Sequence, residues 1–350
     1  MNQDKGALLS RGAAIPASPL ALDKNRRFDE RRQAGLYEYY AAAGAGGVAV
    51  AVHTTQFEIR EPRHGLLRPV LELAARTLAG LEERHGRPII RVAGVCGATA
   101  QAAAEAELAA SLDYDVALLS LAAMRTATDD ELIAHCETIA RIIPLIGFYL
   151  QPAVGGRPLS YNFWRRFAEI TNVLAIKIAP FDRYKTLDVV RAVADAGAED
   201  RITLYTGNDD NIISDLVTPF VFGPPGKTKT LRIRGGLLGQ WSVWTKTFAT
   251  LLDDIHGIAD SGAPIPSELI TKNAQLTDAN AAIFDASHNY AGCIPGIHEI
   301  LRRQGLLDNI YCLNSDKALS PGQSDEIDRV IRDYPWLPDD DFVRGLQLSA

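Results

Sequence analysis

Lys177 is the residue with the clearest chemical potential, because it lies inside the apolar run Val173–Ala179. The run is short, rich in β-branched residues and followed by a proline, which predicts a strand buried on both faces. Burial disfavours the ammonium form, so the pKa of such a lysine falls and the neutral amine can attack a carbonyl carbon. Alternatively, Lys177 ends the strand and reaches water while its stem packs on the core.

Other polar side chains follow neighbouring apolar runs at the points where the predicted strands end. His53-Thr54-Thr55 follows one run, Tyr149 lies at the end of another, and Gly207 is followed closely by Asp209. In a barrel of parallel strands, functional groups gather at the carboxyl ends of the strands. The set then combines an amine nucleophile, a phenol and two hydroxyl groups.

Short apolar runs alternate regularly with longer amphipathic stretches through most of the chain. Eight such units predict a parallel sheet, because parallel strands need helical crossovers. Eight units favour closure into a (β/α)₈ TIM barrel, with an open sheet as the second possibility. The predicted strands are 13–17, 47–53, 89–94, 115–120, 145–150, 174–178, 202–206 and 231–237. The predicted helices are 27–43, 66–85, 100–112, 129–142, 161–170, 186–196, 211–217 and 244–256.

The two ends of the chain lie outside this pattern. Residues 1–12 are predicted to be a loose tail, and residues 13–257 the barrel. Residues 258–350 lack strand signals but keep helical periodicity, which predicts a helical C-terminal region. We expect this region to cover part of the barrel or to make subunit contacts. The segment 223–228 has a superficial likeness to a phosphate loop, but its spacing and two prolines predict a turn.

Composition restricts the class of protein. The net charge of −7 argues against a nucleic-acid partner, and no apolar stretch reaches the roughly 20 residues that span a bilayer. The start of the chain lacks signal-peptide features. Four scattered cysteines predict free thiols in a reducing compartment, so we expect a cytoplasmic protein. No spacing predicts a metal site, and we expect no cofactor. The cysteines are Cys96, Cys136, Cys293 and Cys312.

Three local patterns resemble the family of dihydrodipicolinate synthase and N-acetylneuraminate lyase, the pyruvate-type class I aldolases. Both threonines of the family's G-T-T-G-E segment are kept as Thr54 and Thr55. The family's Y-N-x-P motif is matched by Tyr149-Leu150-Gln151-Pro152, and its G-I-K by Ala175-Ile176-Lys177. The tyrosine and lysine are 28 residues apart, which is close to the family's spacing. The likeness runs from about residue 13 to about residue 307.

The resemblance implies a role for each matching residue. Lys177 would form a Schiff base with the 2-oxo group of pyruvate or another 2-oxo acid, and Tyr149 would carry a proton. Thr54 and Thr55 would hold the substrate carboxylate, and Gly207 is a further candidate for substrate binding. The implied activity is that of a lyase, either an aldolase or a dehydratase. A homo-oligomer, dimer or tetramer, is implied as well.

The sequence also departs from the family pattern. His53 replaces the first glycine of the threonine motif, and residues 120–124 lack the tyrosine that the family often has there. His53 is a candidate substitute for proton transfer, because a histidine titrates near neutral pH; a structural histidine is the competing interpretation. Arg157 is a candidate for binding the substrate from a longer loop. These changes argue against dihydrodipicolinate synthase itself.

Two other functions remain open at this point. One is a catalytically silent or ligand-sensing barrel that binds a small carboxylate. The other is a metal-dependent barrel enzyme in which Asp209 or Asp210 serves as a ligand.

Overall fold

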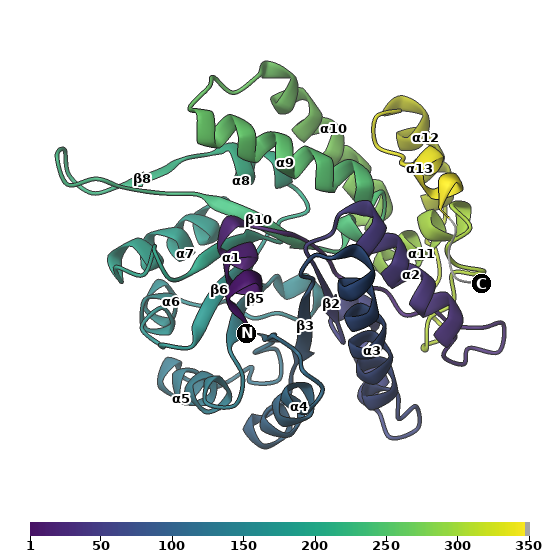
Figure 1. The fold of residues 1–350 in the computed structure, drawn as a ribbon, viewed down its shortest axis with the longest axis horizontal. Helices are drawn as coiled ribbons and strands as arrows, with labels where there is room; N and C mark the ends of the chain where they lie inside the picture. The colour runs from purple at the N-terminus through teal and green to yellow at the C-terminus, as the bar shows by residue number, and fades with distance from the viewer. Residues whose placement is uncertain (347–350) are drawn as a thin grey trace.

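The computed structural model describes residues 1–346, in which a parallel barrel is surrounded by helices (Figure 1). Each apolar run of the sequence becomes a barrel strand and each amphipathic stretch after it becomes a covering helix. The barrel strands are β1 Ala14–Pro16, β2 Gly47–Val50, β3 Ile90–Val95, β4 Val116–Leu119, β5 Leu145–Leu150, β6 Val173–Ala179, β7 Thr203–Thr206 and β10 Ile233–Leu238. The helices that follow them are α2 Glu30–Ala43, α3 Leu67–His85, α4 Thr99–Ser111, α5 Asp129–Ala140, α6 Tyr161–Phe167, α7 Arg183–Asp195, α8 Ile212–Val217 and α9 Thr245–Ser261.

All eight barrel strands are parallel, in the order β1-β10-β7-β6-β5-β4-β3-β2. The two outer strands, β1 and β2, meet through a bridge between Ala17 and Ala49. The amide of Ser18 also donates to the carbonyl of Ala49, at 2.8 Å. The sheet therefore closes into the predicted (β/α)₈ barrel, and the open sheet is rejected.

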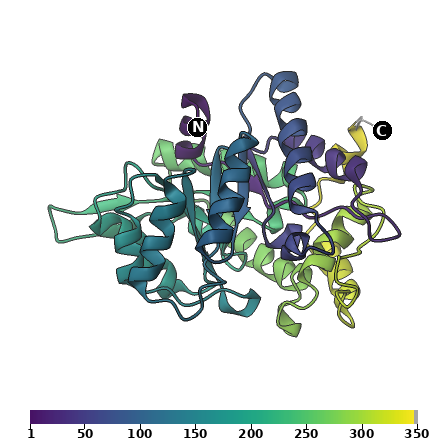
Figure 2. The same ribbon diagram turned by 90° about the horizontal axis from the view of Figure 1, so that it is seen from below.

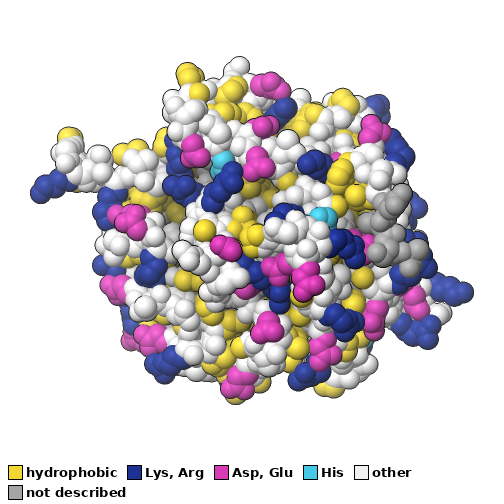
Figure 3. Space-filling model, viewed as in Figure 1, with side chains coloured by type: hydrophobic (Ala, Val, Ile, Leu, Met, Phe, Trp, Pro, Cys, Tyr) yellow, Lys and Arg dark blue, Asp and Glu magenta, His cyan; other side chains and the backbone are white. Residues whose placement is uncertain are grey.

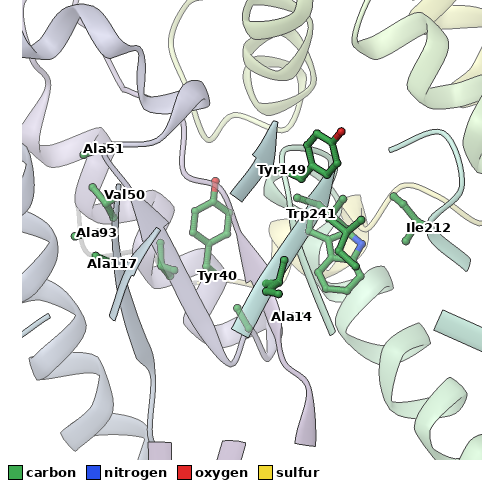
Figure 4. Packing of buried hydrophobic residues seen from close by; sticks show 14 of the residues in the cluster. Ala14, Tyr40, Val50, Ala51, Ala93, Ala117, Tyr149, Ile212 and Trp241 are labelled. Carbon is green, nitrogen blue, oxygen red and sulfur yellow. The ribbon is translucent and has the colours of Figure 1, made fainter. Parts of the chain in front are cut away.

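Two apolar layers hold the barrel together. Alternate residues of each strand point inward, and on β6 these are Ala175, Lys177 and Ala179, while Ile176 and Ile178 face the helices. Figure 4 shows part of the outer layer, between strands and helices. The small alanines on either side of Lys177 leave room for its long side chain inside the barrel.

Helix caps fix where the covering helices begin. The hydroxyl of Thr128 accepts a hydrogen bond from the amide of Glu131, and the Glu131 carboxylate accepts one from the amide of Thr128. This capping box starts α5, and Ser160 starts α6 by accepting from the amide of Phe163. Capping satisfies amides that have no partner within the helix.

The prediction of a loose tail at residues 1–12 is wrong, because helix α1 (Gln3–Arg11) lies at the amino ends of the strands. Lys5 is 5% exposed, and its Nζ lies 2.9 Å from Glu82 and 3.0 Å from Asp115. The hydroxyl of Tyr205, inside the barrel, donates to the carbonyl of Leu9 at 2.8 Å. Figure 2 shows α1 above the barrel. This helix closes the end of the barrel opposite the predicted site.

A β-hairpin interrupts the chain before the last barrel strand. Strands β8 (Phe220–Phe222) and β9 (Lys229–Leu231) pair antiparallel, and the segment 223–228 between them forms the turn. The amide of Lys227 donates to the carbonyl of Pro224 within it. The hairpin projects from the barrel in both ribbon views (Figures 1 and 2).

The C-terminal region is helical, as the sequence indicates, although residues 347–350 of the predicted region lie outside the described part. It contains α10 Ser267–Ile283, α11 Cys293–Arg303, α12 Gln323–Asp333 and α13 Asp340–Gly345. The hydroxyl of Tyr39, on α2, donates to Asp339 at 2.7 Å and ties the end of this region to the barrel.

The outer surface mixes charges of both signs. On the face shown in Figure 3, Lys and Arg side chains alternate with Asp and Glu side chains. Among residues 1–346, no helix combines the length and the apolar character that crossing a membrane requires.

Candidate active site

A cavity opens among the carboxyl ends of the barrel strands, and the C-terminal region forms part of its wall. Strand β6 contributes Lys177, and the loops after β2, β5 and β7 contribute most of the other strand-end residues. The residues that line it are Ala17, Val52, His53, Thr54, Phe148, Leu150, Gln151, Val154, Lys177, Ala179, Phe181, Gly207, Asp209, Gly239, Phe284, Tyr290 and Cys293.

Lys177 extends into this cavity from the middle of β6. Its side chain faces the barrel interior, and the residue is 8% exposed. The ammonium lies 4.5 Å from the centroid of the Phe148 ring on β5, and no side chain or carbonyl in the described part of the chain hydrogen-bonds to it. Burial lowers the pKa of Lys177, and the nearby Asp209 opposes that shift. A larger fraction of neutral amine is therefore present near neutral pH than for an exposed lysine.

Asp209 is the charged neighbour of Lys177 in the cavity. Burial raises the pKa of its carboxyl group, and Lys177 opposes this shift. Its Oδ1 is buried without a hydrogen-bond partner among the described residues, while its backbone carbonyl accepts from Asn280 at 2.7 Å. From the sequence, Asp209 was expected only as a possible metal ligand, whereas in the structure it lines the cavity with Lys177 and the two charges interact.

His53 reaches the cavity from the one-turn helix His53–Thr55 that follows β2. Burial lowers the pKa of its imidazole to about 4, and the positive charges of Lys317 and Lys177 add to the effect. The ring is therefore neutral at pH 7. A neutral imidazole can accept a proton through one nitrogen and donate through the other.

The two threonines use their hydroxyl groups to join β1 to the loop after β2. Thr54 donates to the carbonyl of Ala17 at 2.7 Å, and Thr55 donates to that of Ser18 at 2.7 Å. Thr54 lines the cavity and Thr55 does not. A carboxylate only accepts hydrogen bonds. Each hydroxyl proton already has an acceptor in this conformation, which contradicts the predicted carboxylate contact through the hydroxyls. The contact predicted through the backbone N–H groups of the same residues stays a prediction.

Tyr149 does not face the cavity, so the prediction that it carries a proton to the substrate is wrong for this geometry. Its hydroxyl donates to the carbonyl of Leu159 and accepts from the amide of the same residue, both at 3.2 Å. The ring lies 5.4 Å from that of Trp164 on α6. Figure 4 shows Tyr149 among the side chains of the outer apolar layer. The register pairs Phe148, and not Tyr149, with Lys177.

Arg157 also lies away from the cavity, which corrects its predicted role in substrate binding. Its guanidinium donates to the carbonyls of Met124 and Ala127, and it holds the loop after β4. Gly207, in contrast, lies in the cavity wall beside the stem of Lys177.

Several wall residues were missed by the sequence analysis. Gln151, after β5, is 8% exposed, and its side-chain amide has no hydrogen-bond partner in the described part. Phe181 follows β6, while Phe284, Tyr290 and Cys293 come from the C-terminal region. Gln151 is part of the Tyr149-Leu150-Gln151-Pro152 match, which could have indicated it. Nothing in the sequence indicated that residues 284–293 lie at the mouth of the barrel.

Potential metal ligands are dispersed. Within residues 1–346, no three His, Cys, Asp or Glu side chains form a group that could hold a metal ion. The four cysteines carry free thiols in the structure, and burial raises the pKa of Cys293, the one in the cavity wall.

Sequence comparison finds no matching family model and no similar curated protein. Solved structures, however, share the fold at low identity. Dihydrodipicolinate synthase from Aquifex aeolicus matches with a TM-score of 0.72 and 16% identity, over 94% of this chain and 99% of that one. The pyruvate complex of a prophage protein of the dihydrodipicolinic acid synthase family from E. coli K12 matches with a TM-score of 0.72 and 14% identity, over 92% and 98%. The pyruvate complex of the synthase from Acinetobacter baumannii matches with a TM-score of 0.71 and 18% identity, over 92% and 98%.

Proposed function

We propose that the protein is a Schiff-base-forming lyase of the dihydrodipicolinate synthase family, which acts on pyruvate or another 2-oxo acid through Lys177. One observation carries the proposal: the buried amine of Lys177 projects into the cavity at the carboxyl ends of the strands, without a hydrogen-bond partner among the described residues. The shared fold supports it, because two of the similar structures contain pyruvate. The match of Ala175-Ile176-Lys177 to the family's G-I-K pattern supports it independently.

The proposed reaction begins with the neutral amine. Nζ of Lys177 attacks C2 of the 2-oxo acid, the oxo oxygen leaves as water, and an iminium bond joins nitrogen to C2. The iminium withdraws electrons, so a proton on C3 becomes acidic and its loss gives an enamine. The enamine carbon can then attack an aldehyde. In the reverse direction, the bond between C3 and the former aldehyde carbon breaks and releases the aldehyde. In a dehydratase, the enamine instead expels a hydroxyl group, as water, from the carbon next to C3.

Proton transfer requires groups other than Tyr149 in this account. Asp209 is near Lys177, and its raised pKa keeps part of the carboxyl population protonated closer to neutral pH. His53 is neutral and lines the same cavity. We assign both to proton transfer, because a positioned acid or base contributes about 10²–10⁴-fold to such a step.

Gln151 is our candidate for holding the substrate carboxylate. Its side-chain amide supplies two N–H donors and has no partner in the described part of the chain. A fixed carboxylate would orient C2 of the substrate toward Nζ of Lys177. The Thr54 hydroxyl could assist only after releasing the carbonyl of Ala17.

The proposed family membership leads us to expect a homo-oligomer, and the four free cysteines lead us to expect a cytoplasmic protein. The subunit contacts would differ from those that depend on the family's tyrosine, since residues 120–124 contain none.

Deuterium exchange into pyruvate tests the proposed enamine. In D₂O, reversible loss of a C3 proton replaces the methyl hydrogens with deuterium, which proton NMR records as loss of the methyl signal. We expect exchange with the wild-type protein and none above background with Lys177→Ala. Lys185→Ala, a partly exposed lysine on α7 outside the cavity lining, is the control and should exchange as wild type. Equal exchange by Lys177→Ala and the wild type would refute the proposal.

A further inference from the structure

The cavity wall beyond Lys177 is predominantly aromatic and aliphatic. Phe148, Phe181, Phe284 and Tyr290 supply four rings, and Val52, Leu150 and Val154 add aliphatic surface. Phe284 is positioned beside the predicted carboxylate motif: a Cβ at Gly239 would lie 3.5 Å from both Phe284 Cε1 and Thr54 Cγ2. Phe284 and Thr54 therefore lie close together in the wall of the cavity that Lys177 enters.

Two of these rings are held in place by unusual backbone conformations. Phe181 has φ 52° and Tyr290 has φ 66°, in the left-handed region that side chains other than glycine rarely adopt. The two rings meet edge to face, with their centroids 6.0 Å apart. Such strain persists only where surrounding contacts enforce it, and it is concentrated at functional sites.

Hydrogen bonds from buried groups enforce both conformations. The amide of Phe181 donates to the side-chain oxygen of Asn208, which is itself fully buried and donates to Asp215. The amide of Tyr290 donates to the carbonyl of Asp285, whose carboxylate accepts from the amide of Gly292 and the hydroxyl of Ser320. The aromatic pair therefore belongs to a rigid wall before any ligand arrives.

The charges in the wall disfavour a second anionic group on the substrate. Lys177 is the only Lys or Arg among the described residues that line the cavity. In the proposed iminium its nitrogen is bonded to C2 of the substrate. Asp209 carries the same sign as a second carboxylate. Lys317, which lies outside the lining and whose charge acts on His53, is already paired with Glu58 at 3.0 Å. No unpaired cation of the described wall remains for a dicarboxylic acid.

We propose that the substrate carries an aromatic ring beyond its 2-oxo acid group, packed against Phe181, Phe284 and Tyr290, and carries no second carboxylate. This inference rests on the proposed function, because the 2-oxo acid end is assigned to Lys177. The ring would enter as part of a 2-oxo acid in the cleavage direction, or as an aryl aldehyde in the condensation direction.

Calorimetric binding of two unreactive acids tests this inference without the Schiff base. 4-Phenylbutanoate and glutarate share a carboxylate and a three-carbon chain, and differ in carrying a phenyl ring or a second carboxylate at its end. We expect 4-phenylbutanoate to bind the full-length protein at least about tenfold more tightly, the lower end of what one apolar group contributes in a fitted pocket. Tyr290→Ala should reduce this ratio about tenfold, while Tyr184→Ala, a residue 84% exposed on α7, should preserve it.

The outcomes separate the two proposals. Equal or tighter binding of glutarate overturns the aromatic substrate class, and so does a ratio unchanged by Tyr290→Ala. In either case, deuterium exchange into pyruvate by the wild type would leave the Schiff-base lyase intact. Tight binding of 4-phenylbutanoate without any exchange would support the aromatic pocket and reject the lyase chemistry.

Discussion

The stem of Lys177 lies so close to Gly207 that a Cβ atom at position 207 would come within 2.5 Å of Lys177 Cε. The same Cβ would lie 2.8 Å from that of Ala179. Real Cβ atoms do not approach other heavy atoms so closely, so any side chain at 207 must displace the lysine. The end of β7 therefore sets the direction in which the amine of β6 points.

Gly207→Ala should consequently reduce deuterium exchange into pyruvate about 100-fold, because a shift of about 1 Å in a reacting group has effects of this size. Gly257→Ala, in α9, is the matched control, since its added methyl group would meet nothing within 4 Å. Proton NMR of the pyruvate methyl group measures both rates. Wild-type exchange by a folded Gly207→Ala protein would show that the position of the Lys177 stem does not matter.

Asp209 should control the pH dependence of the reaction. Its negative charge favours the protonated amine and so raises the pKa of Lys177 against the lowering effect of burial. Asp209→Asn removes that charge, so the pKa of Lys177 should fall further and the neutral amine should appear at lower pH.

The measurement is the initial rate of imine formation with pyruvate against pH, trapped at short times. This rate rises with pH as the amine of Lys177 loses its proton. The rise should move to lower pH in Asp209→Asn and stay in place in Asp254→Asn, a change at an exposed residue of α9. A movement to higher pH would contradict the electrostatic relationship between Asp209 and Lys177.

Gln151→Leu should weaken pyruvate binding, because the substitution removes the amide donors assigned to the carboxylate. We expect the pyruvate concentration at half-maximal exchange to rise at least about tenfold, on the order of 1.5–3 kcal/mol for a hydrogen bond to a charged group. Gln275→Leu, on α10 away from the cavity lining, is the control. An unchanged concentration dependence in Gln151→Leu would remove Gln151 from the substrate site.

Tyr149→Phe distinguishes the structure from the family pattern. The hydroxyl of Tyr149 bonds both backbone groups of Leu159, so its loss should lower the free energy of unfolding by about 1–3 kcal/mol. Exchange into pyruvate should change by less than about threefold, since the ring lies outside the cavity. A well-folded Tyr149→Phe protein with a 100-fold loss of exchange would return the tyrosine to the catalytic role that its motif implies.

The N-terminal helix should contribute strongly to stability through the two ion pairs of Lys5. Lys5→Met leaves the partly buried carboxylates of Glu82 and Asp115 without their lysine and should cost about 3 kcal/mol in urea unfolding. Arg11→Met removes an exposed pair with Asp253, 3.7 Å apart, and should cost less than about 1 kcal/mol. Equal, small effects would mean that α1 is not required to close the barrel.

Much of the barrel and its central lysine could be predicted from the sequence, because strand burial leaves a direct apolar signature. Val173–Ala179 is a strand, and Lys177 is buried within it, as the run indicates. Which side chains of β5 point into the barrel could not be predicted in the same way. Side chains alternate along a strand, so an error of one position reverses the side chain's direction. The tyrosine motif identified the correct strand end but not that Phe148 is the residue paired with Lys177.

The rest of the site depends on contacts between distant parts of the chain. Phe284 and Tyr290 reach the cavity through the packing of α10 and α11, more than 100 residues after Lys177. Nothing in their local sequence distinguishes them from ordinary core residues. Likewise, α1 has few apolar residues and is anchored by the ion pairs of Lys5 with Glu82 and Asp115, which hydrophobic periodicity does not detect.

Borohydride reduction tests the central claim most directly. Hydride converts the imine of pyruvate and Lys177 into a stable secondary amine, so the labelled peptide gains the mass of pyruvate less one water plus two hydrogens. Peptide mapping should find this addition on Lys177 alone, and Lys177→Ala should gain none. The absence of an adduct under saturating pyruvate, or an adduct confined to lysines outside the cavity such as Lys185, would contradict the account.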